Sequence, residues 1–168
     1  MNWKMLYPWM HLREIMLILE ELAPGRKTML EWGSGGSTPF FAQYAKHMVS
    51  VEHDPAWFAK VQAPEKVRRF LVEPNLVVPP AESTYAAYKD YVDKPLSLGL
   101  KYDVVLIDGR ARLACALKVI PHLAPGGVVF IHDFWKKTRG RYRPVLNHYK
   151  EIASVRSTTA TIIKLRPK

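Results

Sequence analysis

The stretch from 30 to 39, which reads Leu-Glu-Trp-Gly-Ser-Gly-Gly-Ser-Thr-Pro, constrains the fold of this chain more than any other feature. It follows a short apolar run and precedes an apolar helical pattern, which predicts a strand, a tight turn and a helix start. Glycines let such a turn bend sharply and bring its backbone close to a ligand. Because the amides of a helix's first turn point into the crevice of an open α/β sheet, this turn is predicted to hold a cofactor. The residues that serve these needs are Gly33, Gly35 and Gly36, with Ser37 or Thr38 as the helix cap.

Two acids and one missing glycine indicate which cofactor this is. The dinucleotide pattern G-x-G-x-x-G requires a glycine at position 38, which is Thr38 here, so the NAD fingerprint fails. Glu31 stands two residues before the first glycine, and Glu52 ends the next apolar run. A carboxylate at the end of a second strand is placed to accept hydrogen bonds from ribose hydroxyls.

With this loop and these two acids, the chain resembles the class I S-adenosylmethionine (SAM)-dependent methyltransferases. The resemblance implies that Glu31 serves the methionine end of SAM and that Glu52 holds the ribose. Glu73, after the third strand, either contacts the adenine or is a solvated loop carboxylate. The cofactor-binding residues implied by the resemblance are Glu31, Gly33, Ser34, Gly35, Gly36, Ser37, Thr38, Glu52, His53, Glu73 and Asp108.

Apolar runs alternate with helical patterns along the chain, which is typical of a doubly wound α/β fold. Two last β-rich segments, 152–156 and 159–165, have a short connection that predicts a hairpin. Residues 1–168 are therefore expected to form a single domain around a mostly parallel, seven-stranded, Rossmann-like sheet with an antiparallel last strand. The other expected strands are 28–32, 48–52, 69–72, 102–108 and 128–131, and the expected helices are 9–23, 38–46, 55–61 and 113–120.

Two segments lie outside this alternation. Residues 1–24 form an N-terminal helical segment, whose aromatic residues (Trp3, Tyr7 and Trp9) either cover the bound ligands or pack in the core. Residues 74–100 form an insertion on the expected substrate side. Its three tyrosines, at three-residue spacing, share a helix face and either line the substrate site or simply pack; they are Tyr85, Tyr88 and Tyr91.

The composition limits partners and compartment. Twenty-five Lys and Arg against 15 Asp and Glu give a net charge of +10, which favours an anionic partner or serves only solubility. The single cysteine, Cys115, excludes an internal disulfide and a Cys-based zinc site. No apolar run approaches the roughly 20 residues of a membrane span, and the first residues lack the pattern of a signal peptide. We therefore expect a soluble, cytoplasmic protein.

Asp108 and the pair His132-Asp133 end neighbouring predicted strands and should face the cofactor loop. The pattern I-D-G … L-x-P-G-G-V-V-x-x-H-D resembles methyltransferases that act on sugar hydroxyls and small hydroxylated molecules, and also catechol-type O-methyltransferases. The second resemblance implies a divalent cation, such as Mg²⁺, Mn²⁺ or Co²⁺, held by Asp108, His132 and Asp133. Without a metal, His132 or Asp108 can be the general base. The purely structural alternative is that Asp108 caps a helix and His132 braces its loop.

Cations surround the same edge of the predicted sheet. Arg110 and Arg112 follow Asp108, and the run 136–143 carries five cations and no acid. Such groups bind carboxylate or phosphate, or form a solvated loop. The residues expected at the acceptor are Arg110, Arg112, Trp135, Arg139 and Arg141.

These features together predict a SAM-dependent O-methyltransferase that acts on a hydroxyl of a glycan, a sugar or another anionic small acceptor, with or without a divalent metal. One alternative is an RNA methyltransferase, which the charge favours. The strand that ends at Asp108 lacks the Asn/Asp-Pro-Pro-aromatic motif used on base amines. The other alternative is a non-catalytic binding subunit with the same fold.

Overall fold

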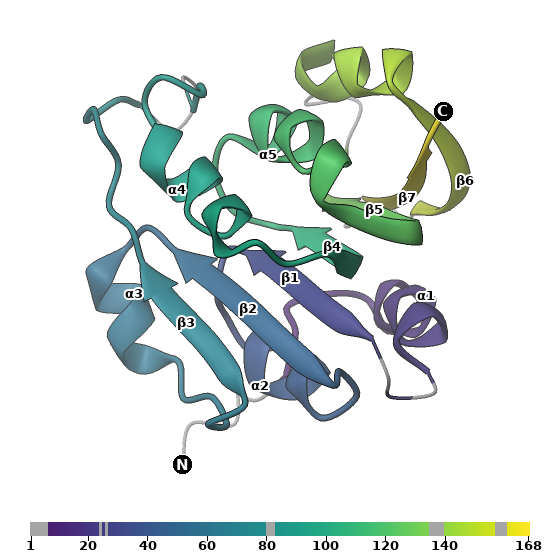
Figure 1. Ribbon diagram of the computed structural model, residues 1–168, viewed down its shortest axis with the longest axis horizontal. Helices are drawn as coiled ribbons and strands as arrows, with labels where there is room; N and C mark the ends of the chain where they lie inside the picture. The colour runs from purple at the N-terminus through teal and green to yellow at the C-terminus, as the bar shows by residue number, and fades with distance from the viewer. Residues whose placement is uncertain (1–6, 24, 26, 80–82, 135–139, 157–160) are drawn as a thin grey trace.

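A computed structural model of the chain describes residues 7–23, 25, 27–79, 83–134, 140–156 and 161–168. In this part of the chain one seven-stranded sheet has the order β3-β2-β1-β4-β5-β7-β6 (Figure 1). The first five strands are parallel, and β7 pairs antiparallel with both β5 and β6, as expected from the predicted hairpin. The strands are β1 (Thr28–Trp32), β2 (His47–Glu52), β3 (Val67–Leu71), β4 (Tyr102–Ile107), β5 (Leu123–His132), β6 (Tyr149–Arg156) and β7 (Thr161–Pro167).

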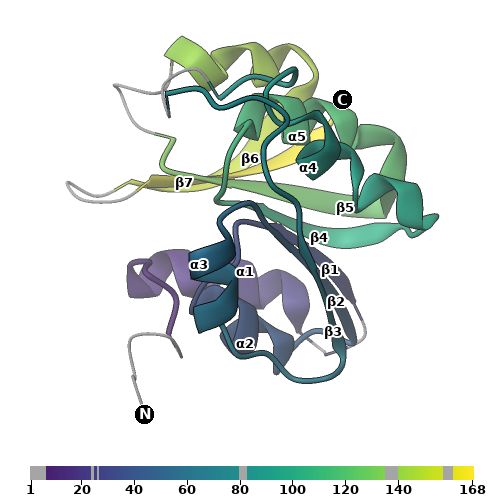
Figure 2. The same cartoon turned by 90° about the vertical axis from the view of Figure 1, so that its left-hand side faces the viewer.

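Helices cover both faces of the sheet (Figure 2). One face packs against α1 (Leu12–Leu22) and α2 (Ser37–Ala42), with α3 (Pro55–Lys60) on the same side. The other face packs against α4 (Lys89–Asp93) and α5 (Arg112–Lys118). Three short 3-10 helices complete the described elements: η3 (Leu96–Leu98), η4 (Ile120–His122) and η5 (Arg143–Asn147). None of the helices in these described ranges is long and apolar enough to cross a membrane.

Alternation along β1 decides where its polar residue lies. Leu30 and Trp32 are buried toward α4 and α5, where the indole Nε1 of Trp32 donates to the carbonyl of Tyr91 at 3.1 Å. Met29 is buried toward α1 and α2. Since successive side chains of a strand point to opposite faces, Glu31 shares the side of Met29, beside Ser50 on β2. The carboxylate therefore lies beneath the glycine loop, inside the protein.

Several predicted boundaries differ from the observed ones. The first helix begins at Leu12 because His11 is its N-cap, and α2 spans only Ser37–Ala42. The helix expected over the three tyrosines is shorter still: α4 starts at Lys89, after Tyr85 and with Tyr88 as its N-cap. Tyr88 and Tyr91 are buried core residues whose rings lie 5.9 Å apart, whereas Tyr85 is only partly buried.

Strand β5 is longer than predicted, because it begins at Leu123 and not at 128. It continues through Pro125, Gly126 and Gly127, where the register with β4 shifts between Tyr102 and Val104. A bulge of this kind accommodates an irregular residue without ending the strand. The consequence for the site is small, since the carboxyl ends of β4 and β5 remain in register at Ile107 and Ile131.

Candidate active site

The glycine loop and the end of β4 touch through their backbones. Gly33 has a φ of +96°, and a Cβ on it would lie 2.7 Å from the amide nitrogen of Gly109. Any other residue at 33 would therefore be strained and would push the two loops apart. A Cβ on Gly36 would likewise collide with the carbonyl oxygen of Tyr7. These two glycines are required by the chain itself, whatever the ligand.

Glu31 is fully buried under the loop and holds it in place. Its carboxylate accepts hydrogen bonds from the hydroxyls of Thr38, at 2.6 Å, and Ser50, at 2.7 Å, and from that of Ser37. Burial raises the pKa of Glu31 to about 7, although the three hydroxyls act to lower it. Ser37 and Thr38 thus turn inward to this acid, and Gly36 is the N-cap of α2 without any side-chain capping bond. The cap expected at 37 or 38 is therefore wrong.

Glu31 does not line the cavity above the loop, in contrast to Glu52. One oxygen of Glu52 accepts from the amide of Ser34 at 2.8 Å, and the other accepts from the amides of His53 and Asp54 at 2.8 and 2.9 Å. The Nδ1 atom of His53 also lies 2.7 Å from this second oxygen. Since a carboxylate oxygen can accept two hydrogen bonds, the oxygen bonded to Ser34 keeps capacity for a ligand hydroxyl.

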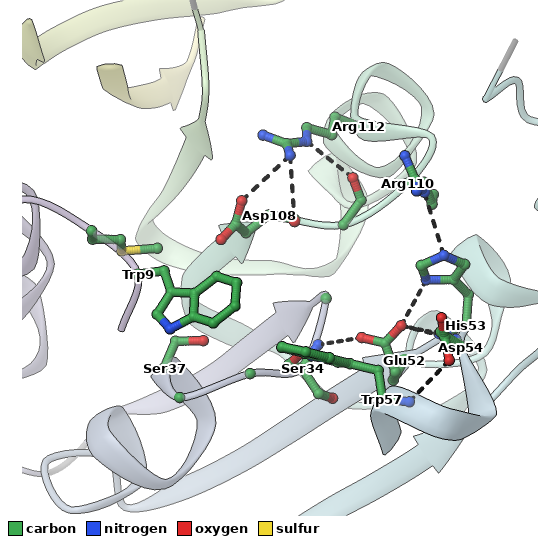
Figure 3. Close-up of a pocket in the computed structure, with 15 residues that line it drawn as sticks. Trp9, Ser34, Ser37, Glu52, His53, Asp54, Trp57, Asp108, Arg110 and Arg112 are labelled. Atoms are coloured by element: carbon green, nitrogen blue, oxygen red, sulfur yellow. Dashed lines mark hydrogen bonds and ion pairs between the residues drawn. The ribbon is translucent and has the colours of Figure 1, made fainter. Parts of the chain in front are cut away.

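A cavity of about 380 Å³ opens over this loop (Figure 3). Two tryptophans flank it: Trp9 and Trp57 lie edge to face with ring centroids 5.5 Å apart, and the indole of Trp57 donates to the carbonyl of Ser34 at 2.5 Å. Trp9 is 68% exposed, which places it over the cavity and outside the core. The full lining is Trp9, Met10, Gly33, Ser34, Gly35, Gly36, Ser37, Glu52, His53, Asp54, Trp57, Asp108, Gly109, Arg110 and Arg112.

The surroundings of Gly35 are the evidence that this cavity can hold SAM. A Cβ on Gly35 would meet no atom of the chain closer than 3.8 Å, so folding does not require a glycine there. It lies in the cavity lining, where a side chain would occupy the space above the loop. An acid placed for ribose, flat indoles and a loop kept free of side chains are the features that a nucleoside with an amino-acid tail needs.

Glu73 lies outside this arrangement. It is exposed, and it is absent from the described residues that line the cavity. The adenine contact expected from the sequence therefore has no counterpart at Glu73, whereas the indole of Trp57 does face the cavity.

At the opposite wall, the structure brings Asp108 and His132 together. The Nδ1 atom of His132 lies 2.9 Å from Oδ1 of Asp108 and 3.7 Å from Oδ1 of Asp133. Its Nε2 atom lies 3.6 Å from Oε2 of Glu14. Burial alone would lower the pKa of His132, but the hydrogen bond to Asp108 and the nearby carboxylates of Glu14 and Asp133 outweigh it and raise the pKa to about 10. This shift favours the protonated form of the ring.

Glu14 is a site residue that the sequence analysis missed. It is completely buried in the first turn of α1, where its Oε2 atom also accepts from the amide of His11 at 2.8 Å. Within the described chain, its other oxygen has no hydrogen-bond partner. The available signal was a charged residue four positions before the buried Ile18, on the apolar face of the helix.

Arg112 occupies a different place from the one expected. Its guanidinium donates to the carbonyls of Gly109, at 3.0 Å, and His132, and lies 3.2 Å from Oδ2 of Asp133 and 3.4 Å from Oδ1 of Asp108. This side chain ties the end of β4 to the end of β5 (Figure 3 shows its bonds on the β4 side). Arg112 is thus largely committed to the protein, although it lines the cavity.

The same bonds decide how well a divalent metal fits. Donor atoms of Asp108, His132 and Asp133 lie within 4.8 Å of one another, close enough for one small cation. However, the guanidinium of Arg112 lies against both carboxylates, and the protonated ring of His132 lies against Asp108. A metal would have to displace one cation and deprotonate the other. The three residues expected to hold a metal thus lie close enough to do so, and binding it would require both of these changes.

Arg110 and Arg141 line a second cavity, which is described below. Arg110 lines both cavities, and its Nε atom lies 3.3 Å from Nε2 of His53. Arg141 is exposed and lines only the second cavity. The other two residues expected at the acceptor, Trp135 and Arg139, lie outside the described residues.

Comparison with known proteins assigns this architecture. The profile of a family described as a methyltransferase domain matches residues 30–134, which is more than half of the chain. No protein of curated function matches the sequence. The chain belongs to this methyltransferase-domain family. It is a SAM-dependent methyltransferase of the class I superfamily, which confirms the fold class and the enzyme class expected from the sequence.

Three solved structures illustrate the likeness in fold. A methyltransferase-like protein from Silicibacter pomeroyi has a TM-score of 0.63 and 23% identity, over 96% of this chain and 89% of its own. A tRNA methyltransferase, TrmI, from Aquifex aeolicus has a TM-score of 0.67 and 15% identity, over 95% and 70%. The N-methyltransferase NodS from Bradyrhizobium japonicum, in complex with S-adenosylhomocysteine, has a TM-score of 0.58 and 13% identity, over 92% and 86%. One of them is named as a tRNA methyltransferase and another as an N-methyltransferase, and a shared fold does not define the acceptor.

Proposed function

We propose that this methyltransferase transfers a methyl group to a hydroxyl of a small anionic acceptor, and that Asp108 receives the hydroxyl proton. The observation that supports the proposal is the position of Asp108. Its carboxylate lies in the wall of the same cavity that contains Gly35 and Glu52. An acceptor oxygen within hydrogen-bond reach of Asp108 therefore shares a cavity with the methyl donor.

The chemistry asks little of the protein beyond placement and proton transfer. Bound SAM supplies a methyl group on a positively charged sulfur, which leaves with the bonding electron pair as the new O–C bond forms. The wall residues hold the acceptor oxygen in line with that methyl group, an effect that can supply much of a rate enhancement. Asp108 accepts the hydrogen bond of the hydroxyl and then its proton, which passes to solvent through the open side of the cavity.

His132 acts in this proposal as a positioning residue. Both of its ring nitrogens face carboxylates, and its pKa of about 10 means that it already carries a proton at neutral pH. It cannot accept another, which argues against His132 as the general base. Instead its Nδ1–H group fixes Oδ1 of Asp108.

We also propose that the reaction needs no divalent cation. Arg112 and the imidazolium supply positive charge beside the reacting oxygen, which is the electrostatic help that a metal would give. The metal-assisted mechanism remains the alternative, and chelation separates the two.

The acceptor is expected to be anionic because of the positive charge that Arg110 brings to the cavity and that the chain carries as a whole. Arg110 reaches the cofactor cavity, and the chain as a whole carries +10. A sugar or glycan that carries both a hydroxyl and a carboxylate is one acceptor of this kind. An RNA acceptor shares the charge, so the experiment includes it as a competing outcome.

The test measures S-adenosylhomocysteine formation by the purified chain with three acceptors: glucuronate, 4-hydroxybenzoate and a short RNA. Mass spectrometry of the product then identifies a methyl ether. We expect a methyl ether on a carboxylate-bearing acceptor, and a loss of turnover of about 10²–10⁴-fold in Asp108→Asn. Methylation of RNA bases, or full activity in Asp108→Asn, would contradict the proposal.

A further inference from the structure

A second cavity, of about 450 Å³, lies next to the cofactor cavity. It opens between α5 and two segments that are distant in sequence, Ser83–Tyr85 and Arg141–Tyr142, which lie on the same side of the sheet (Figure 2). Arg110 and Arg112 line both cavities, so the two spaces meet at these side chains. Because Arg112 also lies 3.4 Å from Asp108, this junction is beside the group proposed to take the proton.

The wall of this second cavity is largely apolar. Leu113, Ala114 and Leu117 line it from α5, and Tyr85 and Tyr142 line it from the two other segments. Each of these side chains is only partly buried, although four of them pack on the core beneath. Apolar and aromatic walls of this kind bind flat, apolar groups, because such groups leave water on binding.

The charged residues of the cavity have one sign. In the described part of the chain its lining includes Arg110, Arg112 and Arg141 and no acid. Outside the lining, Lys118 lies with its Nζ atom 4.6 Å from the centroid of the Tyr85 ring, and the hydroxyl of Tyr85 donates to Asp93 at 2.8 Å, so these two outer charges have opposite signs. Arg112 is bound to the ends of β4 and β5, whereas Arg141 lies exposed at the mouth. A carboxylate on the ligand is the group that such a mouth would bind.

We propose that this second cavity binds the methyl acceptor, and that the acceptor is a flat apolar molecule with a carboxylate at one end and a hydroxyl at the other. The apolar body lies between α5 and the two tyrosines. The carboxylate lies at Arg141, and the hydroxyl passes Arg110 toward Asp108. The assignment rests on the proposed function, since it names the acceptor class for that same reaction.

The test measures binding without methyl transfer, so that its outcome does not depend on turnover. Calorimetry of the purified chain saturated with S-adenosylhomocysteine gives the Kd of 4-hydroxybenzoate. Its methyl ester removes the charge, and glucuronate keeps the charge but lacks the flat apolar body. We expect 4-hydroxybenzoate to bind at least about tenfold more tightly than either, because the ester loses the charged hydrogen bond and glucuronate lacks the apolar surface that leaves water on binding.

Two substitutions test the two halves of the cavity. Arg141→Ser should weaken 4-hydroxybenzoate about tenfold, whereas Arg143→Ser, two residues further and outside the lining, should leave it within about twofold. Ala114→Phe should abolish binding by filling the space between α5 and the tyrosines. Its control is Ala59→Phe on the exposed face of α3, which should bind as the unaltered chain does.

The outcomes separate the two proposals. No binding of 4-hydroxybenzoate, equal binding of its ester, or unchanged binding in a folded Ala114→Phe variant would each overturn the acceptor assignment. Normal binding together with no methyl ether under turnover conditions would instead overturn the proposed reaction. A thermal melt of each variant, matched to the unaltered chain, shows that a loss of binding is local.

Discussion

Oε2 of Glu14 lies 3.6 Å from Nε2 of His132, so a residue of the N-terminal helix lies beside the carboxyl end of β5. Asp108 faces the other nitrogen of the same ring at 2.9 Å. The imidazolium therefore joins α1 to the ends of β4 and β5 through two carboxylates. Trp9 and Met10, which precede α1 in the chain, line the same cavity as Asp108, so this contact links that wall to the group proposed to take the proton.

This pair of contacts gives the protein a pH dependence of defined sign. The pKa of His132 is raised from 6.5 to about 10 in the folded chain, so folding favours the protonated ring. The resulting stabilisation is complete below pH 6.5 and is lost as the pH rises toward 10. We expect the free energy of unfolding, measured in urea, to fall across this window by more in the unaltered chain than in Glu14→Gln. Parallel curves for the two proteins would contradict the assignment.

Replacement of Glu52, the acid proposed to hold the ribose, should weaken the binding of SAM. Glu52→Ala is expected to reduce SAM affinity by about 1–3 kcal/mol in calorimetry, the range for a lost bond to a charged acceptor. Glu73→Ala is the matched control, because Glu73 is exposed and outside the cavity lining. Unchanged SAM affinity in Glu52→Ala, or an equal loss in Glu73→Ala, would remove Glu52 from the cofactor site.

Substitutions at Gly33 and Gly35 should have different effects. Gly35→Val is expected to fold normally and to lose SAM binding, because its side chain enters the cavity without a clash in the chain. Gly33→Val should instead lower the melting temperature, since φ is +96° there and the Cβ meets Gly109. A thermal melt with and without SAM distinguishes the two, and the reverse pattern would refute the roles assigned to these glycines.

Chelation should leave turnover intact. With Arg112 and the imidazolium already against the carboxylates, exhaustive EDTA treatment is expected to change the rate less than about twofold. Arg112→Gln, in contrast, should lower kcat while SAM affinity stays close to normal. Loss of activity in EDTA, with recovery on adding Mg²⁺, Mn²⁺ or Co²⁺, would restore the metal site expected from the sequence.

The parts of the site that follow from local pattern were predictable. Gly33 and Gly35 follow β1, Glu52 ends β2, and Asp108 follows β4. Their positions follow from the spacing along the strands, and all of them line the cavity. The direction of side chains was not predictable. From the sequence, Ser37 and Thr38 could equally well cap the helix or donate hydrogen bonds to Glu31, and in the structure they donate to Glu31. Only the sheet register, which sets Ser50 beside Glu31, decides between the two.

Long-range charge pairing was also beyond the sequence. The sequence predicts that Arg112 binds the acceptor, because it follows Asp108 at the same edge of the sheet. In the structure its guanidinium instead donates to the carbonyl of His132, at the end of β5. From the sequence, Glu14 is an ordinary acid in the first turn of a helix. Nothing in the sequence indicates that this turn of α1 packs beside His132. Contacts between elements far apart in the chain depend on the assembled sheet, and spacing rules do not contain them.

The close approach of Gly33 to Gly109 has a consequence for protein engineering. The two loops are in contact backbone to backbone, with no side chain between them to absorb a change of shape. A loop transplanted from another methyltransferase into either position would therefore have to match the backbone of the other loop, or the two would clash. Exchanges that move both loops together keep the matching surfaces, so chimaeras should be designed in pairs.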